Sequence, residues 1–166
     1  MIGNQIVYDV LVRKCKYKLS EIMVLGFGQG GMVGLLLARE LGLGLFRNSD
    51  DSDSSYQNLN LSGVVSIGAP YPLASAASGT STSTASTSRK NSSPVLLIYG
   101  RDSVVVSDSA IQRTKNVFEF VQLHQYARRG DTMPRNRDEV LPLMQFFARR
   151  LKSRLGVPEG SVEISS

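Results

Sequence analysis

Four glycines within six residues, Gly26-Phe27-Gly28-Gln29-Gly30-Gly31, constrain the fold of this chain more than any other feature. A short apolar run, Glu21–Leu25, precedes them, and a helical spacing of apolar residues follows over 32–41. Glycine tolerates positive φ and lets backbones approach closely, so this cluster predicts a tight turn from a strand into a helix. Two unrelated chemistries use such a turn.

The first is dinucleotide binding. Gly26, Gly28 and Gly31 match the fingerprint G-x-G-x-x-G, in which the amides at a helix start hold a pyrophosphate. The fingerprint also needs an acidic residue at the end of the next strand. That strand-like run, Ser62–Ile67, leads into Gly68-Ala69-Pro70 with no carboxylate, so nucleotide binding stays the less supported alternative.

The second is the nucleophile elbow of α/β-hydrolases, G-x-S-x-G, where a strained turn lifts a serine above the sheet. The run 26–31 resembles the G-F-S-Q-G-G of the phospholipase/carboxylesterase family, which includes acyl-protein thioesterases. Phe27, Gln29, Gly30 and Gly31 all match, whereas Gly28 stands where the family has its serine. Without a hydroxyl at that position, the usual acyl-enzyme cannot form.

Further segments support the resemblance, which covers most of residues 1–158 and corresponds to the C-terminal half of a hydrolase domain. The run 64–73 is similar to the family's next strand and loop, and 94–105 to the strand whose loop carries the catalytic aspartate. The resemblance makes Asp102 the acid candidate, although the loop is one residue shorter than usual. In the loop 129–134, where the family has its histidine, Gly130 and Asp131 stand instead.

The remaining candidates for catalysis are weak. The only histidine, His124, lies in a strand-like run about six residues before the expected loop, where packing explains it better than proton transfer. Asp102 also suits an ordinary turn, in which a carboxylate caps nearby amides. The backbone N–H of Gln29 would supply one oxyanion donor, but no segment over 1–20 resembles the loop that supplies the second. Serines also lie near strand ends, off any recognisable elbow: Ser66, Ser103 and Ser107.

The resemblance therefore implies a serine-hydrolase relative whose family cleaves carboxylic esters or thioesters of acyl chains. We expect this copy to be inactive, because both the serine and the histidine of the triad are replaced. The alternative is a non-catalytic binding or scaffold module, with an acyl or ester small molecule as a possible ligand. We expect no cofactor and no metal site.

Apolar periodicity predicts four strands alternating with helices, hence a mainly parallel α/β sheet with helices on both faces. We expect one incomplete α/β-hydrolase-like domain over 1–158, with its N-terminal strands missing, and a flexible tail over 159–166. The Ser/Thr/Ala-rich stretch 74–93 is predicted to be a disordered insertion.

The expected helices and strands follow from the same pattern. An amphipathic helix begins at Ile2 and ends near 14–16, a short helix spans 108–116, and a last strand spans 117–126. The final helix, which Pro142 should kink or delay, places its apolar residues on one face: Val140, Leu143, Met144, Phe147 and Leu151.

The missing strands would leave an open sheet edge. The run Ile22–Leu25 has the composition of a buried central strand, yet its neighbours on one side are absent, so its edge is exposed to pairing or aggregation. Either another chain covers this edge or the natural product is longer. We favour a longer product, with Met1 as a truncated start.

Composition fits one domain of 166 residues with 42% apolar content and a net charge of +5. A lone Cys15 excludes an internal disulfide, and no signal peptide or membrane span is apparent, so we expect a cytoplasmic protein. Arginines flank the last loop without interleaved aromatic residues, which favours a solvated face over nucleic-acid binding: Arg128, Arg129, Arg135 and Arg137.

Overall fold

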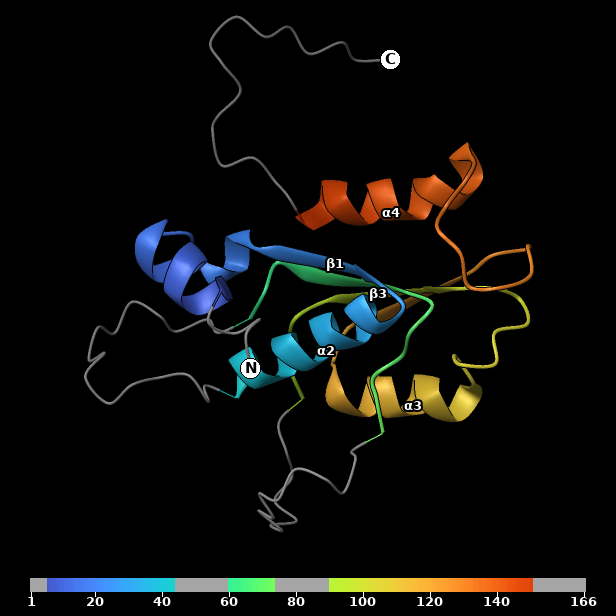
Figure 1. Cartoon of the computed structure of the whole chain (residues 1–166), viewed down its shortest axis with the longest axis horizontal. Helices are drawn as coiled ribbons and strands as arrows, with labels where there is room; N and C mark the ends of the chain where they lie inside the picture. The colour runs from blue at the N-terminus through green and yellow to red at the C-terminus, as the bar shows by residue number, and fades with distance from the viewer. Residues whose placement is uncertain (1–5, 44–59, 74–89, 151–166) are drawn as a thin grey trace, which may run out of the picture.

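Four short strands form one parallel sheet in the order β1-β2-β3-β4 (Figure 1). The computed structural model describes residues 6–43, 60–73 and 90–150. The strands are β1 (Met23–Phe27), β2 (Gly63–Ile67), β3 (Val95–Tyr99) and β4 (Val121–Gln125). All five residues of β2 are buried and β3 is nearly as buried, because a parallel sheet is covered on both faces.

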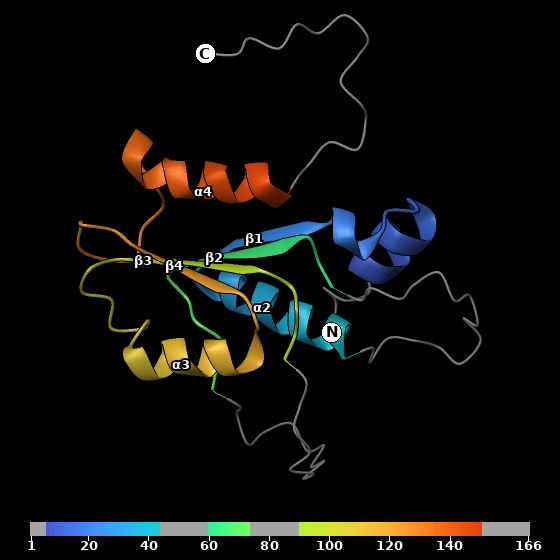
Figure 2. The same ribbon diagram turned by 180° about the vertical axis from the view of Figure 1, so that it is seen from behind.

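Helices cover the two faces of the sheet (Figures 1 and 2). Helices α2 (Gln29–Gly42) and α3 (Asp108–Val117) lie on one face, and α4 (Arg137–Arg150) lies on the other. A π-helix, η1 (Ile6–Lys14), and a single 3-10 turn, η2 (Leu19–Glu21), precede β1. Within the described ranges, no helix combines the length and the apolar character that crossing a bilayer requires.

The alternation of side chains along each strand separates the buried clusters on the two faces of the sheet. Val64 and Val95 face α2 and pack with its buried stripe, which includes Leu35. The neighbouring residues of β2 and β3 point the other way and pack with Phe146 of α4 and with Tyr126 after β4: Val65, Ile67, Leu96 and Ile98. The sheet is therefore a true middle layer.

The predicted fold class is confirmed, and several predicted boundaries move. Strand β1 continues through Gly26 and Phe27, so the turn is confined to Gly28. The predicted strand over 117–126 is shorter, because α3 extends to Val117 and β4 starts only at Val121.

Helix α4 differs most from its prediction. It begins at Arg137 and runs through Pro142, so the proline does not delay its start. Its buried apolar residue is Phe146, 2% exposed, which the predicted face omitted, whereas Met144 is 55% exposed. Leu151 lies outside the described residues.

Most of the predicted insertion over 74–93 lies outside the described residues, as do the predicted tail over 159–166 and the start of the first helix. The last part of the insertion is described, and Asn91 and Ser93 are buried there. The Asn91 side chain donates to the Ala38 carbonyl at 2.8 Å, and Ser93 Oγ accepts from the Leu61 N–H at 3.0 Å. These bonds attach the segment preceding β3 to α2 and to the segment preceding β2.

Arg128 anchors α4 to the segment that follows β4. Its guanidinium donates to both Glu139 carboxylate oxygens, at 3.1 and 3.0 Å, and also to Thr132 and the Met133 carbonyl. Glu139 is 9% exposed and the Arg128 side chain 27%, so the pair is part-buried. The prediction that Arg128 belongs to a solvated face is therefore wrong, because its charge is matched by a carboxylate 11 residues later.

Phe146 should dominate the stability of the α4 layer. Its ring lies over β2, so closely that a Cβ on Gly63 would stand 2.9 Å from ring atom Cε1. Phe146→Ala should lower the free energy of unfolding by about 3–5 kcal/mol, measured by urea denaturation, because it leaves a cavity under the helix. Phe120→Ala, at a phenylalanine 53% exposed, is the matched control and should cost far less. Equal losses would contradict the assignment of Phe146 as the anchor.

The part-buried pair of Arg128 and Glu139 should make the free energy of unfolding depend on pH. The Arg128 guanidinium, followed by the Arg135 N–H, holds the pKa of the Glu139 carboxyl below its ordinary value. The pKa of Glu139 is lower in the folded chain than in the unfolded chain. The stabilisation of the fold by the Glu139 carboxylate is therefore fully present above the unfolded pKa of about 4.3. It is lost as the pH falls through the folded pKa.

The melting temperature should therefore fall more steeply between pH 6 and pH 3 in the native chain than in Glu139→Gln. Glu119→Gln, at an exposed glutamate that accepts a hydrogen bond from Ser92, is the control and should keep the native slope. An unchanged slope in Glu139→Gln would contradict this role.

Candidate functional site

The glycine run forms the predicted turn at the carboxyl end of β1. Gly28 has φ +52° and ψ −123°, and it is the N-cap residue of α2. Its N–H donates to the Ile67 carbonyl at 2.8 Å, and its own carbonyl accepts from the Met32 N–H at 3.2 Å. The chain thus passes from sheet to helix within one residue of positive φ, which glycine adopts without steric cost.

The flanking glycines permit the close approach of α2 to the sheet. A Cβ on Gly26 would overlap the backbone of Gly30 and Gly31, and a Cβ on Gly31 would overlap Ser66 Oγ on β2. Side chains at Gly26 and Gly31 would therefore displace the start of the helix. This is the geometry that a nucleophile elbow requires, in which the residue at the apex points away from the sheet.

The apex itself is open. A Cβ built on Gly28 would meet no atom within 4 Å. Space for a side chain is thus available where an attacking oxygen would project, but glycine supplies none. The N–H of Gln29 lies in the first turn of α2, where helix geometry provides no intrahelical acceptor.

The loop after β3 carries Asp102, the predicted acid. Its Oδ1 accepts the Gly130 N–H at 2.9 Å, and its Oδ2 lies 3.7 Å from Arg129 Nε. Both side chains of this pair are more than half exposed. Asp102 therefore contacts the loop in which the family resemblance expects a histidine, but its partners there are a backbone amide and an exposed arginine.

Asp131, in the loop after β4, binds in turn to the loop after β3, which carries Asp102. Its Oδ1 accepts the Gly100 N–H at 2.9 Å, and its Oδ2 accepts the Ser103 hydroxyl at 2.6 Å. Ser103 Oγ accepts in turn from the Val106 N–H at 2.9 Å. Asp102 and Asp131 thus form a reciprocal clamp, each carboxylate capping an amide of the other's loop.

The clamp lies beside the elbow. A Cβ on Gly68, the residue after β2, would stand 2.7 Å from the Asp131 Cβ. Gly68 directly follows Ile67, whose carbonyl accepts the Gly28 N–H. Asp131 therefore lies against Gly68, and it belongs to the loop in which the resemblance expects a histidine.

His124 stands apart from this arrangement. It lies inside β4, paired in register with Ile98, and its ring makes an edge contact with Tyr126 at a centroid distance of 5.6 Å. Its side chain shares the α4 face of the sheet with Ile98. Burial raises the pKa of neighbouring Tyr126 to about 12, so that phenol stays neutral.

The other serines do not replace the missing nucleophile. Ser66 is fully buried behind the elbow, and its hydroxyl donates to the Ala69 carbonyl at 2.5 Å. Ser103 is bound to Asp131 in the clamp, and Ser107 lies at the start of α3 with its hydroxyl 3.0 Å from that of Ser109. Neither Ser103 nor Ser107 lies at a strand-to-helix apex.

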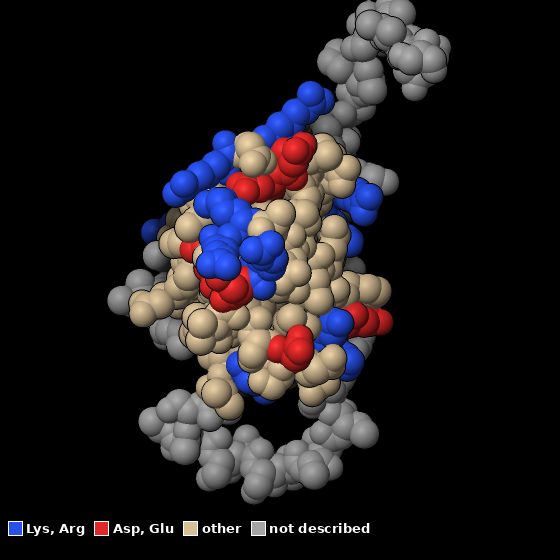
Figure 3. Space-filling model, turned by 90° about the vertical axis from the view of Figure 1, so that its right-hand side faces the viewer, with Lys and Arg blue, Asp and Glu red and all other residues tan. Residues whose placement is uncertain are grey.

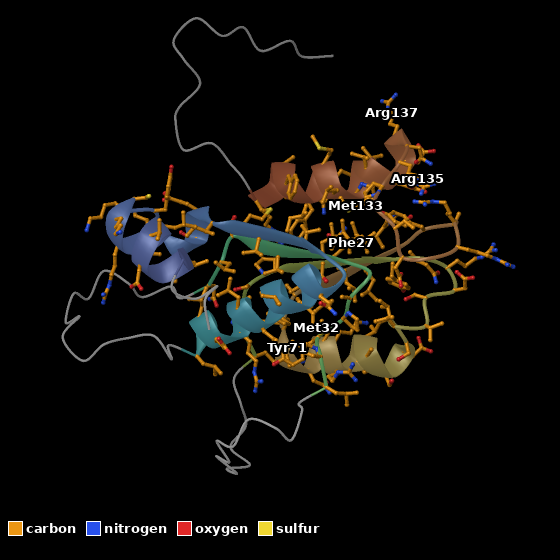
Figure 4. The ribbon with its side chains drawn as sticks, in the orientation of Figure 1. Phe27, Met32, Tyr71, Met133, Arg135 and Arg137 are labelled. Carbon is orange, nitrogen blue, oxygen red and sulfur yellow. The ribbon has the colours of Figure 1, made fainter. Side chains whose placement is uncertain are left out.

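The surface around the carboxyl ends of the strands mixes charges. These ends lie on the right in Figure 1, and Figure 3 looks onto that side, where basic and acidic side chains lie next to one another. In Figure 4, Phe27, Met133, Arg135 and Arg137 lie toward α4. Phe27 and Met133 are 48% and 47% exposed.

On the opposite face, Tyr71 fixes the loop after β2. In Figure 4 it lies with Met32 on the side of α2 and α3. Its hydroxyl accepts from Arg39 Nη1 at 2.7 Å, and its N–H donates to Thr114 Oγ1 at 3.0 Å.

The glycine turn at Gly28 was predicted from the sequence, whereas the role of Asp131 was not. Its clamp joins residues 28 and 31 positions apart, to Ser103 and Gly100. The only signal was its place in the loop where the histidine was expected, next to a glycine that has φ +78° here.

Comparisons with known proteins relate this arrangement to one fold. No model of a known protein family matches the chain, and no curated protein matches its sequence. Among solved structures, the chain is similar to YahD, determined with malic acid, with a TM-score of 0.56 and 15% identity. The match covers 90% of this chain and 60% of YahD, so the chain spans less than two thirds of that protein. The four-stranded parallel sheet and its helices therefore have an α/β-hydrolase-like fold.

Proposed function

We propose that the chain is a catalytically inactive relative of the carboxylesterase-type α/β-hydrolases, from the phospholipase/carboxylesterase group. The observation that carries the proposal is Gly28. It has the backbone of an elbow apex and free space around its missing side chain, yet it carries no nucleophile.

The environment of the other two triad positions supports the same conclusion. Asp131, at the histidine position, has both carboxylate oxygens occupied by the Gly100 N–H and the Ser103 hydroxyl. Asp102, at the acid position, binds the Gly130 N–H. Both groups hold two loops together, which is a structural role, and neither is arranged to take a proton from a group at Gly28.

The retained role in this proposal is non-catalytic binding or scaffolding, with an acyl or ester small molecule as the candidate ligand. Exposed Phe27, directly before the elbow, supports an apolar ligand. We also propose a cytoplasmic location, which suits the single exposed thiol of Cys15. Dinucleotide binding has less support, because Gly68 follows β2 and the nearby Asp131 carboxylate is already engaged.

The native chain should not react as a serine hydrolase. Incubation with a fluorophosphonate probe should leave every hydroxyl unmodified, as mapped by mass spectrometry, and short-chain nitrophenyl esters should be hydrolysed no faster than by heat-unfolded chain. A phosphonate adduct on Ser103 or any other hydroxyl would refute the proposal. Stabilisation by a fatty acid in a thermal shift assay, without turnover, would support the binding role, whereas stabilisation by NAD alone would favour the nucleotide alternative.

Restoring two side chains should restore reactivity. Gly28→Ser places a hydroxyl at the open apex, and Asp131→His places a base beside it. The double variant should label with fluorophosphonate roughly a hundredfold faster than Gly28→Ser alone, because a positioned general base contributes about 10²–10⁴ in rate. The variant Gly28→Ser/Asp131→Asn, which has no base, is the matched control. A folded double variant no more reactive than this control would contradict the assignment of Gly28 and Asp131 to these positions.

A further inference from the structure

Strand β1 has no strand beside its outer edge among the described residues. It is the first strand of the sheet, and the strand that it pairs with is β2. Of the two explanations weighed from the sequence, a longer product or coverage by another chain, the geometry of this edge bears on the second. The Gly28 N–H points to β2, and successive residues of a strand direct their backbone groups to opposite edges. Met23, Leu25 and Phe27 therefore direct their N–H and carbonyl groups outward.

The same three residues carry apolar side chains onto the α4 face. Met23 packs against the cluster around Phe146, and Leu25 and Phe27 follow it at the two-residue period, 45% and 48% exposed. None of the features that normally block pairing, such as a charge, a proline or a bulge, is present within β1. The edge thus offers hydrogen-bonding groups and apolar surface together.

Helix α4 extends this apolar surface. It runs antiparallel to the strands, since the Ser62 hydroxyl at the start of β2 donates to its Arg150 carbonyl. With this direction, the right-handed winding of the helix turns a stripe containing Met144 and Phe147 toward β1. Phe147 packs against the same cluster as Met23, whereas Met144 is 55% exposed.

We propose that β1 pairs with β1 of a second copy of this chain in an antiparallel, two-fold symmetric dimer. With Leu25 on the axis, Leu25 faces its counterpart and Met23 faces Phe27 of the other copy. Each of these positions is a hydrogen-bonded pair, so about six backbone bonds form. Methionine beside phenylalanine is a favourable contact, so the edge complements itself.

Two-fold symmetry also explains the exposed stripe of α4. The axis is normal to the sheet, so both α4 helices lie on one face of the joined eight-stranded sheet. The stripes containing Met144 then face each other across the paired strands. A stable dimer buries on the order of 1,600 Å². A five-residue strand pair is too small to supply this alone, so the proposed interface includes the two α4 stripes.

Pairing of β1 with β4 of another copy is less favourable. The opposite edge is polar, with Gln122, His124 and Gln125 in β4. That contact would join apolar to polar surface and would repeat head to tail, giving open polymers. Pairing of β1 with β1 leaves neither copy with an unpaired β1 edge, and it gives a closed dimer instead of a polymer.

The test is the mass of the full chain by sedimentation across a concentration series. The native chain should sediment as a dimer. Leu25→Lys should raise the dimer dissociation constant roughly thirtyfold or more, the effect of a central interface residue. Val104→Lys, at a valine 92% exposed in the loop after β3, is the matched control and should remain dimeric.

Leu25→Pro is a second variant that separates pairing from folding. The Leu25 N–H points outward, so proline removes an edge donor without breaking a bond to β2. It should also be monomeric, with a circular dichroism spectrum like that of the native chain. A native monomer at every concentration, long polymers, or a dimer that persists in both Leu25 variants would each overturn the proposal.

Hydrogen exchange tests the register directly. In the native dimer the Leu25 and Phe27 amides should be protected, and in Leu25→Lys the Phe27 amide should exchange at least about tenfold faster. The Gly26 amide, which points to β2, is the internal control and should change much less. A dimer whose Phe27 amide exchanges as fast in the native chain as in Leu25→Lys would exclude pairing through β1.

Discussion

The close approach of α2 to the sheet is the constraint on which the rest of the structure depends. Gly26 and Gly31 lack the Cβ atoms that would push strand and helix apart, and Gly28 supplies the positive φ that turns one into the other. With α2 held there, its stripe around Leu35 packs on β2 and β3. The elbow is thus required by the fold whether or not its apex carries a reactive group.

Under the proposed function, this separation of fold from chemistry would let the site keep its shape without a serine or a histidine. Replacing an apex side chain by hydrogen removes strain, because glycine adopts φ +52° freely. The loops around the apex are then held by carboxylate-to-amide bonds, which need no histidine. Asp131 binding Gly100, and Asp102 binding Gly130, fix the two loops to each other.

Local rules predicted the parts of the fold that depend on neighbours in sequence. The glycine turn, the buried strands and the helix after Gly28 follow from conformational preference and apolar period. The inward face of α4 could not be predicted in this way, because apolar spacing alone allowed either Met144 or Phe146 to face the sheet. The choice depends on the rotation of the helix, which Arg128 sets by binding Glu139. The hydrogen bonds of Asp131 could not be predicted from the sequence either, because they join loops that are distant in sequence.

The open edge and the missing nucleophile are physically independent. The apex at Gly28 points away from the sheet at the carboxyl end of β1, whereas the edge is formed by backbone groups along Met23, Leu25 and Phe27. Phe27 belongs to both, because it is the last edge residue and the first neighbour of the apex. An occupant of the edge would therefore cover Phe27, whereas Gly28 lies beyond the last residue of the strand.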